Sequence, residues 1–278
     1  MRFGRIAVLA AVAACVSSAA AAEGRAGGGT PITTCGQVVT TNAYLTQNLH
    51  CTGSSAVVVG ADKVTVDLKG FRLRGDGSFG HFGIDDNGFD SVTIKNGTVR
   101  TFFIGVHAFG GADRVSISDV VSSGNAAYGV EVLGDSAKIK TVTASGNASD
   151  GFLTSGASTA FQSVVATGNT AYGIDVTGDS ASVKSSIADG NSNGILVVGN
   201  RARIQSSSAS GNADFGIFVN GNAGLVKSNT ADGNGFDGGA SVLSGVGIGA
   251  MWPTTATTGT NVARGNDDTA ECSPVSLC

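Results

Sequence analysis

GVEVLGDSAKIKTVTASGNASD (129–150), GFLTSGASTAFQSVVATGNTAY (151–172) and GIDVTGDSASVKSSIADGNSN (173–193) are three consecutive copies of one repeat. Two further copies follow, GILVVGNRARIQSSSASGNADF (194–215) and GIFVNGNAGLVKSNTADGNGFD (216–237). The glycines that open the copies are 21 or 22 residues apart: Gly129, Gly151, Gly173, Gly194, Gly216 and Gly238. A fixed period of this length is typical of stacked supersecondary units, each of which contacts mainly its neighbours.

Within each copy apolar and polar residues alternate, which indicates β-strands rather than helices. Ile174 and Val176 share one face of such a segment, and Asp175 lies on the other. Three short strands, each ended by Gly, Asn, Asp or Ser, fill the repeat and leave no room for a helix. The three prolines all lie outside the copies, as hydrogen-bonded sheets require (Pro31, Pro253 and Pro274). The repeat therefore predicts an all-β protein, a single parallel β-helix of about 22 residues per coil.

Stacking the copies aligns equivalent positions into columns. Two columns are apolar throughout, so we expect them to form the interior: Ile84, Val106, Val130, Phe152, Ile174, Ile195 and Ile217, and Ile94, Ile117, Ile139, Phe161, Val183, Ile204 and Val226. A third column follows a glycine each time and is always asparagine: Asn125, Asn147, Asn169, Asn191, Asn212 and Asn234. We expect these side-chain amides to form a ladder from coil to coil at a tight corner.

Composition and the N-terminal residues indicate an exported solenoid. The chain has 43 glycines and only 6% aromatic and 14% charged residues, which is unusual for an α/β enzyme. MRFGR, the apolar run 6–14 and SSAAAAEG predict a signal peptide over residues 1–22, followed by a flexible linker over 23–34. The run is too short for a permanent membrane span, and no later segment is a candidate. Val12-Ala13-Ala14-Cys15 also fits a lipoprotein signal, so lipid anchoring at Cys15 stays open as an alternative.

The net charge limits the class of partner that we expect, and the cysteine positions indicate the cellular compartment. Without residues 1–22 the chain carries 15 basic and 21 acidic residues, which argues against a nucleic-acid partner. Four cysteines remain beyond Cys15, two near each end: Cys35, Cys51, Cys272 and Cys278. They allow three pairings or free thiols, and the pairing of sequence neighbours is favoured in an exported protein. Both bridges would then stabilise end caps, which a solenoid needs because its ends expose core and unpaired strand edges.

A resemblance becomes specific in the N-terminal coils. The Cys-Gly opening at 35–36, LTQNLHC (45–51), VTVDLKGFRLRG (64–75) and VTIKNGTV (92–99) together resemble bacterial exported right-handed parallel β-helix repeat proteins. These belong to the pectin-lyase-like superfamily, alongside NosD-type periplasmic proteins and mannuronan carbon-5 epimerases. The resemblance covers about residues 35–240. It implies a right-handed helix over 35–237, with N-terminal cap coils at 35–81, regular repeats at 82–237 and a C-terminal cap at 238–278.

The resemblance also implies that a substrate lies across one sheet, on outward residues. The position two residues after each opening glycine is outward: Asp85, His107, Glu131, Leu153, Asp175, Leu196 and Phe218. Neighbouring strands lie ~4.8 Å apart, so Asp85, His107 and Glu131 should form one line, suited to general acid–base chemistry. The position before each opening glycine adds Tyr128, Asp150 and Tyr172.

We therefore take one group as candidate catalytic residues (Asp85, His107, Glu131 and Tyr128) and another as candidate substrate-binding residues (Asp150, Tyr172, Asp175 and Phe218). Tyr172-Gly173-Ile174-Asp175 resembles the first half of the epimerases' Tyr-Gly-Phe-Asp-Pro-His motif, but Val176 and Thr177 replace its Pro-His. The polygalacturonase motifs and the dense aspartate cluster of calcium-dependent pectate lyases are missing from the sequence. No metal-ligand spacing occurs in the repeats, so no metal or cofactor is implied. In the alternative interpretation these polar residues only keep an exposed sheet solvated.

Two functions fit this sequence. The first is an exported or cell-surface monomer that binds or scaffolds a polysaccharide without catalysis, which short units without inserted loops favour. The second is a polysaccharide lyase or carbon-5 epimerase acting on uronates, with Tyr128, Tyr172 or His107 as the base. A NosD-like role in metal-centre maturation has no ligand spacing behind it. On another sheet the outward lysines Lys95, Lys140, Lys184 and Lys227 are interpreted as a solvated stripe rather than a polyanion site.

Overall fold

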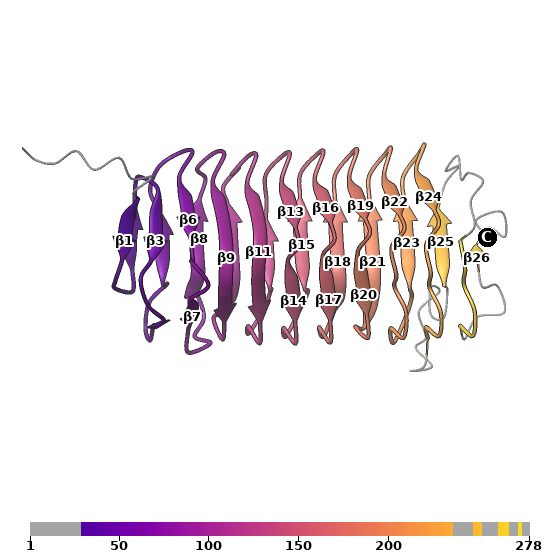
Figure 1. Cartoon of the computed structure of the whole chain (residues 1–278). Helices are drawn as coiled ribbons and strands as arrows, with labels where there is room; N and C mark the ends of the chain where they lie inside the picture. The colour runs from indigo at the N-terminus through magenta and orange to yellow at the C-terminus, as the bar shows by residue number, and fades with distance from the viewer. Residues whose placement is uncertain (1–28, 236–246, 252–260, 267–271, 274–278) are drawn as a thin grey trace, which may run out of the picture.

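The computed structural model describes residues 29–235, 247–251, 261–266 and 272–273. Its coils stack in one straight row from the N-terminal end (indigo in Figure 1) to the C-terminal end (yellow). Every strand pairs in parallel with its neighbours in the row, and the described residues contain strands and turns but no helix. The predicted parallel β-helix is therefore confirmed. None of the described segments is a helix long and apolar enough to cross a membrane.

One sheet contains eleven strands, one from each successive coil. In order these are β2 (Gln37–Val39), β5 (Val57–Val59), β8 (Phe82–Asn87), β10 (Ile104–Phe109), β12 (Val130–Val132), β15 (Phe152–Ser155), β18 (Tyr172–Thr177), β21 (Asn193–Val198), β23 (Ile217–Asn220), β25 (Ile248–Met251) and β26 (Cys272–Ser273).

The other sheet contains fifteen strands and bends around a corner of the coil. Its main path is β1 (Thr30–Ile32), β3 (Ala43–Leu45), β6 (Thr65–Asp67), β9 (Thr93–Arg100), β11 (Ser116–Ser123), β13 (Lys138–Lys140), β16 (Ala160–Gln162), β19 (Ser182–Lys184), β22 (Arg203–Gln205) and β24 (Leu225–Lys227). Its second part comprises β4 (Leu49–His50), β7 (Arg72–Arg74), β14 (Thr143–Ser145), β17 (Val165–Thr167) and β20 (Ile187–Asp189), joined to the first through β9 and β11.

Both apolar columns lie in the interior, as expected. Each of their fourteen side chains is at most 1% exposed. The rings of Phe152 and Phe161 meet edge to face, with centroids 5.6 Å apart, so the two columns pack against each other across the coil. Burial of such side chains, repeated once per coil, is the main favourable term for a fold whose coils contact only their neighbours.

The asparagine ladder is also confirmed. Nδ2 of Asn147 donates to Oδ1 of Asn169 at 2.9 Å, and the Asn147 backbone N–H donates to the same oxygen at 3.1 Å. The glycine before each asparagine has a positive φ, +60° at Gly146, which places the amide inside the corner. A second buried ladder was not anticipated from the sequence and runs through Ser186, Ser207, Asn229 and Asn261.

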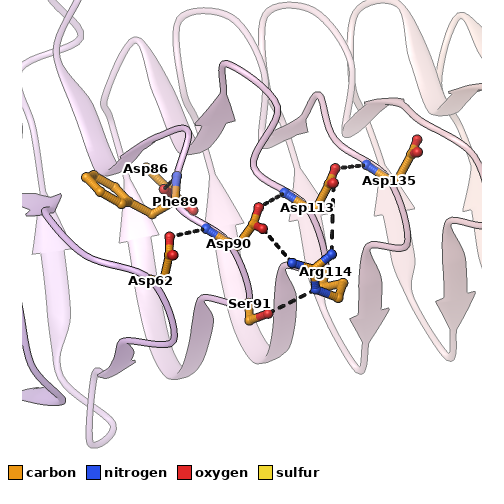
Figure 2. A network of polar contacts seen from close by, with 8 residues as sticks. All are labelled: Asp62, Asp86, Phe89, Asp90, Ser91, Asp113, Arg114 and Asp135. Carbon is orange, nitrogen blue, oxygen red and sulfur yellow. Dashed lines mark hydrogen bonds and ion pairs between the residues drawn. The ribbon is translucent and has the colours of Figure 1, made fainter.

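Aspartates cap a different corner, between the eleven-stranded sheet and the main path of the other (Figure 2). The carboxylate of Asp62 accepts the backbone N–H of Asp90, Asp90 accepts that of Asp113, and Asp113 accepts that of Asp135. The guanidinium of Arg114 lies across this ladder and pairs with Asp90 and Asp113. The side chains of the ladder therefore have a structural role, because each satisfies a backbone donor of the next coil.

Cysteines lie near both ends of the described chain. Cys35 and Cys51 form the predicted bridge beside the first coils, with Cα atoms 5.6 Å apart. Cys272 is buried in β26 and takes part in a disulfide bond, and its predicted partner Cys278 lies outside the described residues, as do Cys15 and the predicted signal and anchor residues. Within the region 238–278, where we expect the C-terminal cap, two described strands continue the stacking, because β25 pairs with β23 and β26 pairs with β25.

Candidate functional site

The outward side of the eleven-stranded sheet is called here the histidine face. Strand register aligns Asp85 with His107 and His107 with Glu131, as neighbours on β8, β10 and β12. The same row continues through Leu153, Asp175, Leu196 and Phe218. Alternation along each strand produces this row, because the flanking residues point into the core.

Both nitrogens of His107 are engaged by its two neighbours. Nδ1 is hydrogen bonded to Oδ1 of Asp85 at 3.1 Å, and Nε2 lies 3.3 Å from Oε2 of Glu131. The first contact is a hydrogen bond when Nδ1 carries hydrogen, because a carboxylate only accepts, and the second is an ion pair when the imidazole is protonated. Burial raises the pKa of Glu131, and the neighbouring His107 opposes that rise. The side chains are mostly buried, with 14% of His107 and 11% of Glu131 exposed.

Phenylalanines surround the His107 ring, and we did not anticipate them as part of the site. Phe82 stacks on one side at a centroid distance of 4.1 Å, and Phe109 lies nearly parallel to the imidazole at 5.6 Å. Phe103 lies 6.4 Å from Phe82 and 4.7 Å from Phe79, which is 84% exposed. The sequence carries a signal for this cluster, because seven of its 13 phenylalanines fall within residues 71–109.

A second group of titratable residues follows toward the C-terminal end of the same face. Asp150 is 5% exposed and accepts the backbone N–H of Tyr172 at 2.9 Å. Burial raises the pKa of Asp150. Burial also raises the pKa of Asp175 to about 6, with Asp150 adding to the rise. Tyr128 and Tyr172 likewise have raised pKa values, first through burial and then through the neighbouring carboxylates.

The environment of Asp175 makes the stability of the protein depend on pH. A carboxyl group whose pKa is raised by folding lowers the free energy of unfolding at any pH where it is ionised in the folded state. For Asp175 this destabilisation is complete above about pH 6 and disappears as the pH falls toward 3.8, the pKa of an ordinary aspartate. We expect Asp175→Asn to raise the Tm at pH 7.5 by about 3 °C, the shift that about 1 kcal/mol causes in a domain of this size. At pH 4 the variant and the parent should melt together.

Scanning calorimetry at the two pH values tests this expectation, with Asp119→Asn as the control. Asp119 is exposed, so its replacement should leave the Tm unchanged at both pH values. A Tm of Asp175→Asn below that of the parent at pH 7.5 would show that the carboxylate is stabilised by its surroundings and not penalised.

Phe218 differs from its expected place. It is an outward candidate substrate-binding residue by register, but only 5% of it is exposed. It packs against Phe215 at 5.7 Å, and Phe215 lies 6.2 Å from Tyr172. The neighbouring aromatic side chains cover the ring, which the row alone did not reveal. Tyr172 and Leu196, which pack against this pair, are the more accessible residues here.

The charges of the histidine face have one sign. Its outward rows in the described residues contain Asp85, Glu131, Asp150 and Asp175 but no Lys or Arg. Within the same described part of the chain, no three or more His, Cys, Asp or Glu side chains form a group that could hold a metal ion. The face therefore offers hydrogen-bond acceptors, one imidazole and aromatic rings. Its described outward rows offer no Lys or Arg to balance an acidic ligand.

Comparison with protein families agrees with this architecture. A family model described as a right handed beta helix region matches residues 55–250. No curated protein matches the chain. Solved structures similar to it include pectate lyase Pel9A (16% identity, TM-score 0.48, covering 82% of this chain and 72% of that one). The A-module of Azotobacter vinelandii mannuronan C-5 epimerase AlgE6 is similar at 16% identity, TM-score 0.49 and coverage of 82% and 78%. The Agl-KA catalytic domain is similar at 12% identity, TM-score 0.45 and coverage of 84% and 54%.

Proposed function

Because this chain belongs to the family of right-handed β-helix regions, we propose that it binds a polysaccharide along the histidine face without catalysing a reaction on it. The observation that carries the proposal is the enclosure of His107. Asp85 and Glu131 occupy its two nitrogens, and Phe82 and Phe109 lie against its ring. A general base needs a nitrogen within hydrogen-bond reach of the proton that it takes, so this arrangement favours a fixed structural imidazole.

Exposed rings supply the apolar contacts that such a ligand needs. Phe79 is 84% exposed and Phe109 is 49% exposed, both at the N-terminal end of the face. Contiguous apolar surface rimmed by polar groups marks ligand-binding grooves in soluble proteins. The row from Asp85 to Phe218 covers six coil steps, or about 29 Å at ~4.8 Å per step, which suits an extended chain of several sugars.

The charge of the face favours a neutral glycan over a uronate. Glu131, Asp150 and Asp175 would repel carboxylates, and no outward Lys or Arg of the described rows neutralises them. With sugar hydroxyls the same carboxylates form strong charge-assisted hydrogen bonds. A lyase or epimerase would also need an ionised tyrosine or a free histidine as base, and the raised pKa of Tyr128 opposes that ionisation.

Export forms part of this proposal. The Cys35–Cys51 bridge persists in an oxidising compartment, in keeping with a periplasmic, extracellular or surface location. Mass spectrometry of the mature protein distinguishes cleavage after Ala22 from lipidation at Cys15.

We expect Phe109→Ala to weaken binding of a neutral hexasaccharide about tenfold, because the variant removes an exposed ring from the histidine face. Calorimetric titration with cello-, xylo-, manno- and laminarihexaose measures the Kd. Ile187→Ala is the matched control: Ile187 is 40% exposed but lies on β20, in the other sheet.

Three results would oppose the proposal. None of the four hexasaccharides binds, or Phe109→Ala binds as the parent does, or Ile187→Ala weakens binding equally. An enzyme is indicated instead if any glycan is cleaved or epimerised and His107→Ala abolishes turnover while binding survives.

A further inference from the structure

A second face of the solenoid carries the opposite charge. We call it the lysine face: the outward residues on the main path of the fifteen-stranded sheet, from β9 to β24. They form two rows, one on each side of the buried column from Ile94 to Val226. The first row is Thr93, Ser116, Lys138, Ala160, Ser182, Arg203 and Leu225, and the second is Lys95, Ser118, Lys140, Gln162, Lys184, Gln205 and Lys227.

Cations recur in the second row on every second coil. Ser118, Gln162 and Gln205 separate the four lysines, in strict register along the sheet. With strands ~4.8 Å apart, successive lysines start ~9.6 Å from each other. The row therefore alternates a positive charge with a side chain that can hydrogen bond to an uncharged group.

The cations of this face are available to a ligand. Lys138, Lys140, Lys184, Arg203 and Lys227 are all exposed. None of the five makes an ion pair with another described residue, and of the row only Lys95 lies near a carboxylate, 3.7 Å from Asp67. Cations beside the face are paired instead, as in Arg114 with Asp90 and Arg201 with Asp179.

Carboxylates are missing from both rows, and those at the corner between the two sheets are already engaged, whereas Asp119, directly after Ser118 at the other corner, is exposed. Asp90 and Asp113 cap backbone donors and hold Arg114 (Figure 2). A hollow of about 420 Å³ lies near the middle of the face, lined by Ser116, Ser118, Lys138, Ile139, Lys140, Ala160 and Gln162. The small side chain of Ala160 leaves this space open between longer neighbours.

We propose that the lysine face binds a linear acidic polysaccharide, with the chain parallel to the solenoid axis. In an extended polysaccharide, every second sugar ring presents the same edge to the same side of the chain. Two rings with their linking oxygens span on the order of 10 Å at bond lengths of ~1.5 Å. An acidic group on that edge would then meet one lysine per two coils, while hydroxyl groups between them meet Ser118, Gln162 and Gln205.

Other polyanions fit this spacing less well. An extended acidic peptide presents side chains to one side every two residues, or about 6.8 Å. Phosphates follow one another at about 3.4 Å along one strand of duplex DNA. A lipid surface would favour exposed apolar side chains, and none of the large ones described as exposed belongs to the two rows of this face (Val38, Phe79, Phe109, Val121 and Ile187). Val121 is on β11 but lies past the corner at Asp119. The lysine face is thus a site separate from the histidine face and independent of its neutral ligand.

The test uses hyaluronan decasaccharide, which carries a carboxylate on every second sugar, and its carboxyl-reduced form as the uncharged probe. Lys140→Gln/Lys184→Gln should weaken decasaccharide binding at least tenfold. Lys63→Gln/Arg74→Gln removes the same charge from exposed positions outside the face and should change the Kd less than twofold. Binding by the parent should weaken as ionic strength rises, because the Debye length falls to about 8 Å at 0.15 M salt.

Several outcomes overturn the proposal: equal binding of the carboxyl-reduced probe, equal effects of the two double variants, or displacement by poly-L-glutamate or duplex DNA at matched charge concentration. The two faces are tested separately. Phe109→Ala should leave decasaccharide binding intact, and the lysine variants should leave neutral hexasaccharide binding intact.

Discussion

Replacing Asn169 by alanine should lower the free energy of unfolding by about 4 kcal/mol, because the change leaves buried donors without acceptors. Oδ1 of Asn169 accepts both the backbone N–H and the side-chain Nδ2 of Asn147, and its own Nδ2 donates to the Ala144 carbonyl at 3.1 Å. Asn169 is 3% exposed, so water cannot replace these bonds. Each buried group left unsatisfied costs about 1–3 kcal/mol, and two donors are affected.

Urea unfolding followed by circular dichroism measures the loss, with Asn222→Ala as the matched control. Asn222 also donates its Nδ2 to an asparagine of the preceding coil, Oδ1 of Asn200 at 3.3 Å, but it is exposed. Its loss should cost less than about 1 kcal/mol because water can take over the bond. Equal effects of the two substitutions would mean that the buried ladder contributes no more than a surface hydrogen bond.

The second large effect is expected for Gly156→Ala. It comes from a steric clash of the added methyl group and not from a backbone conformation that alanine disfavours. A Cβ at Gly156 would lie 2.1 Å from the carbonyl oxygen of Gly134 and 2.5 Å from its carbon, in the preceding coil. Gly178 meets Gly156 in the same way, so this corner is a column of backbone contacts. The methyl group must push two paired coils apart, and we expect a loss of about 3 kcal/mol or more.

Gly168→Ala is the control that separates this steric clash from the strain of alanine at a positive φ. Gly168 has φ +63°, but a Cβ there would meet nothing within 4 Å. Alanine in that conformation costs about 1 kcal/mol through strain alone. Thermal unfolding of both variants measures the difference. If the Tm of Gly156→Ala equals or exceeds that of Gly168→Ala, the coils adjust to the methyl group, and the close backbone approach at Gly156 does not require glycine.

The sequence by itself determined the coil, because every coil repeats the same local contacts with its neighbours. The 22-residue period, the alternation around Ile174 and the asparagine after each corner glycine were enough to place the interior columns and the ladder. They also aligned Asp85, His107 and Glu131 in one row, since strand alternation and coil stacking fix which residues become neighbours. The Cys35–Cys51 bridge followed from position near an end that needs a cap.

Only the tertiary structure decided what lies beside these positions. Phe79 and Phe103 reach the His107 cluster from outside the row, so the repeat period did not place them there. Phe218 is outward by register yet covered by its neighbours, because burial depends on the size of adjacent side chains as well as on the strand. Beyond residue 235 the spacing of laddered asparagines grows from 22 to 32 residues, so periodicity no longer indicated that the stacking continues. The sequence had placed the acidic row and the lysines on different sheets, but only the structure showed that Lys140, Lys184 and Lys227 are exposed and make no ion pair with another described residue, because pairing depends on side chains from neighbouring coils and corners.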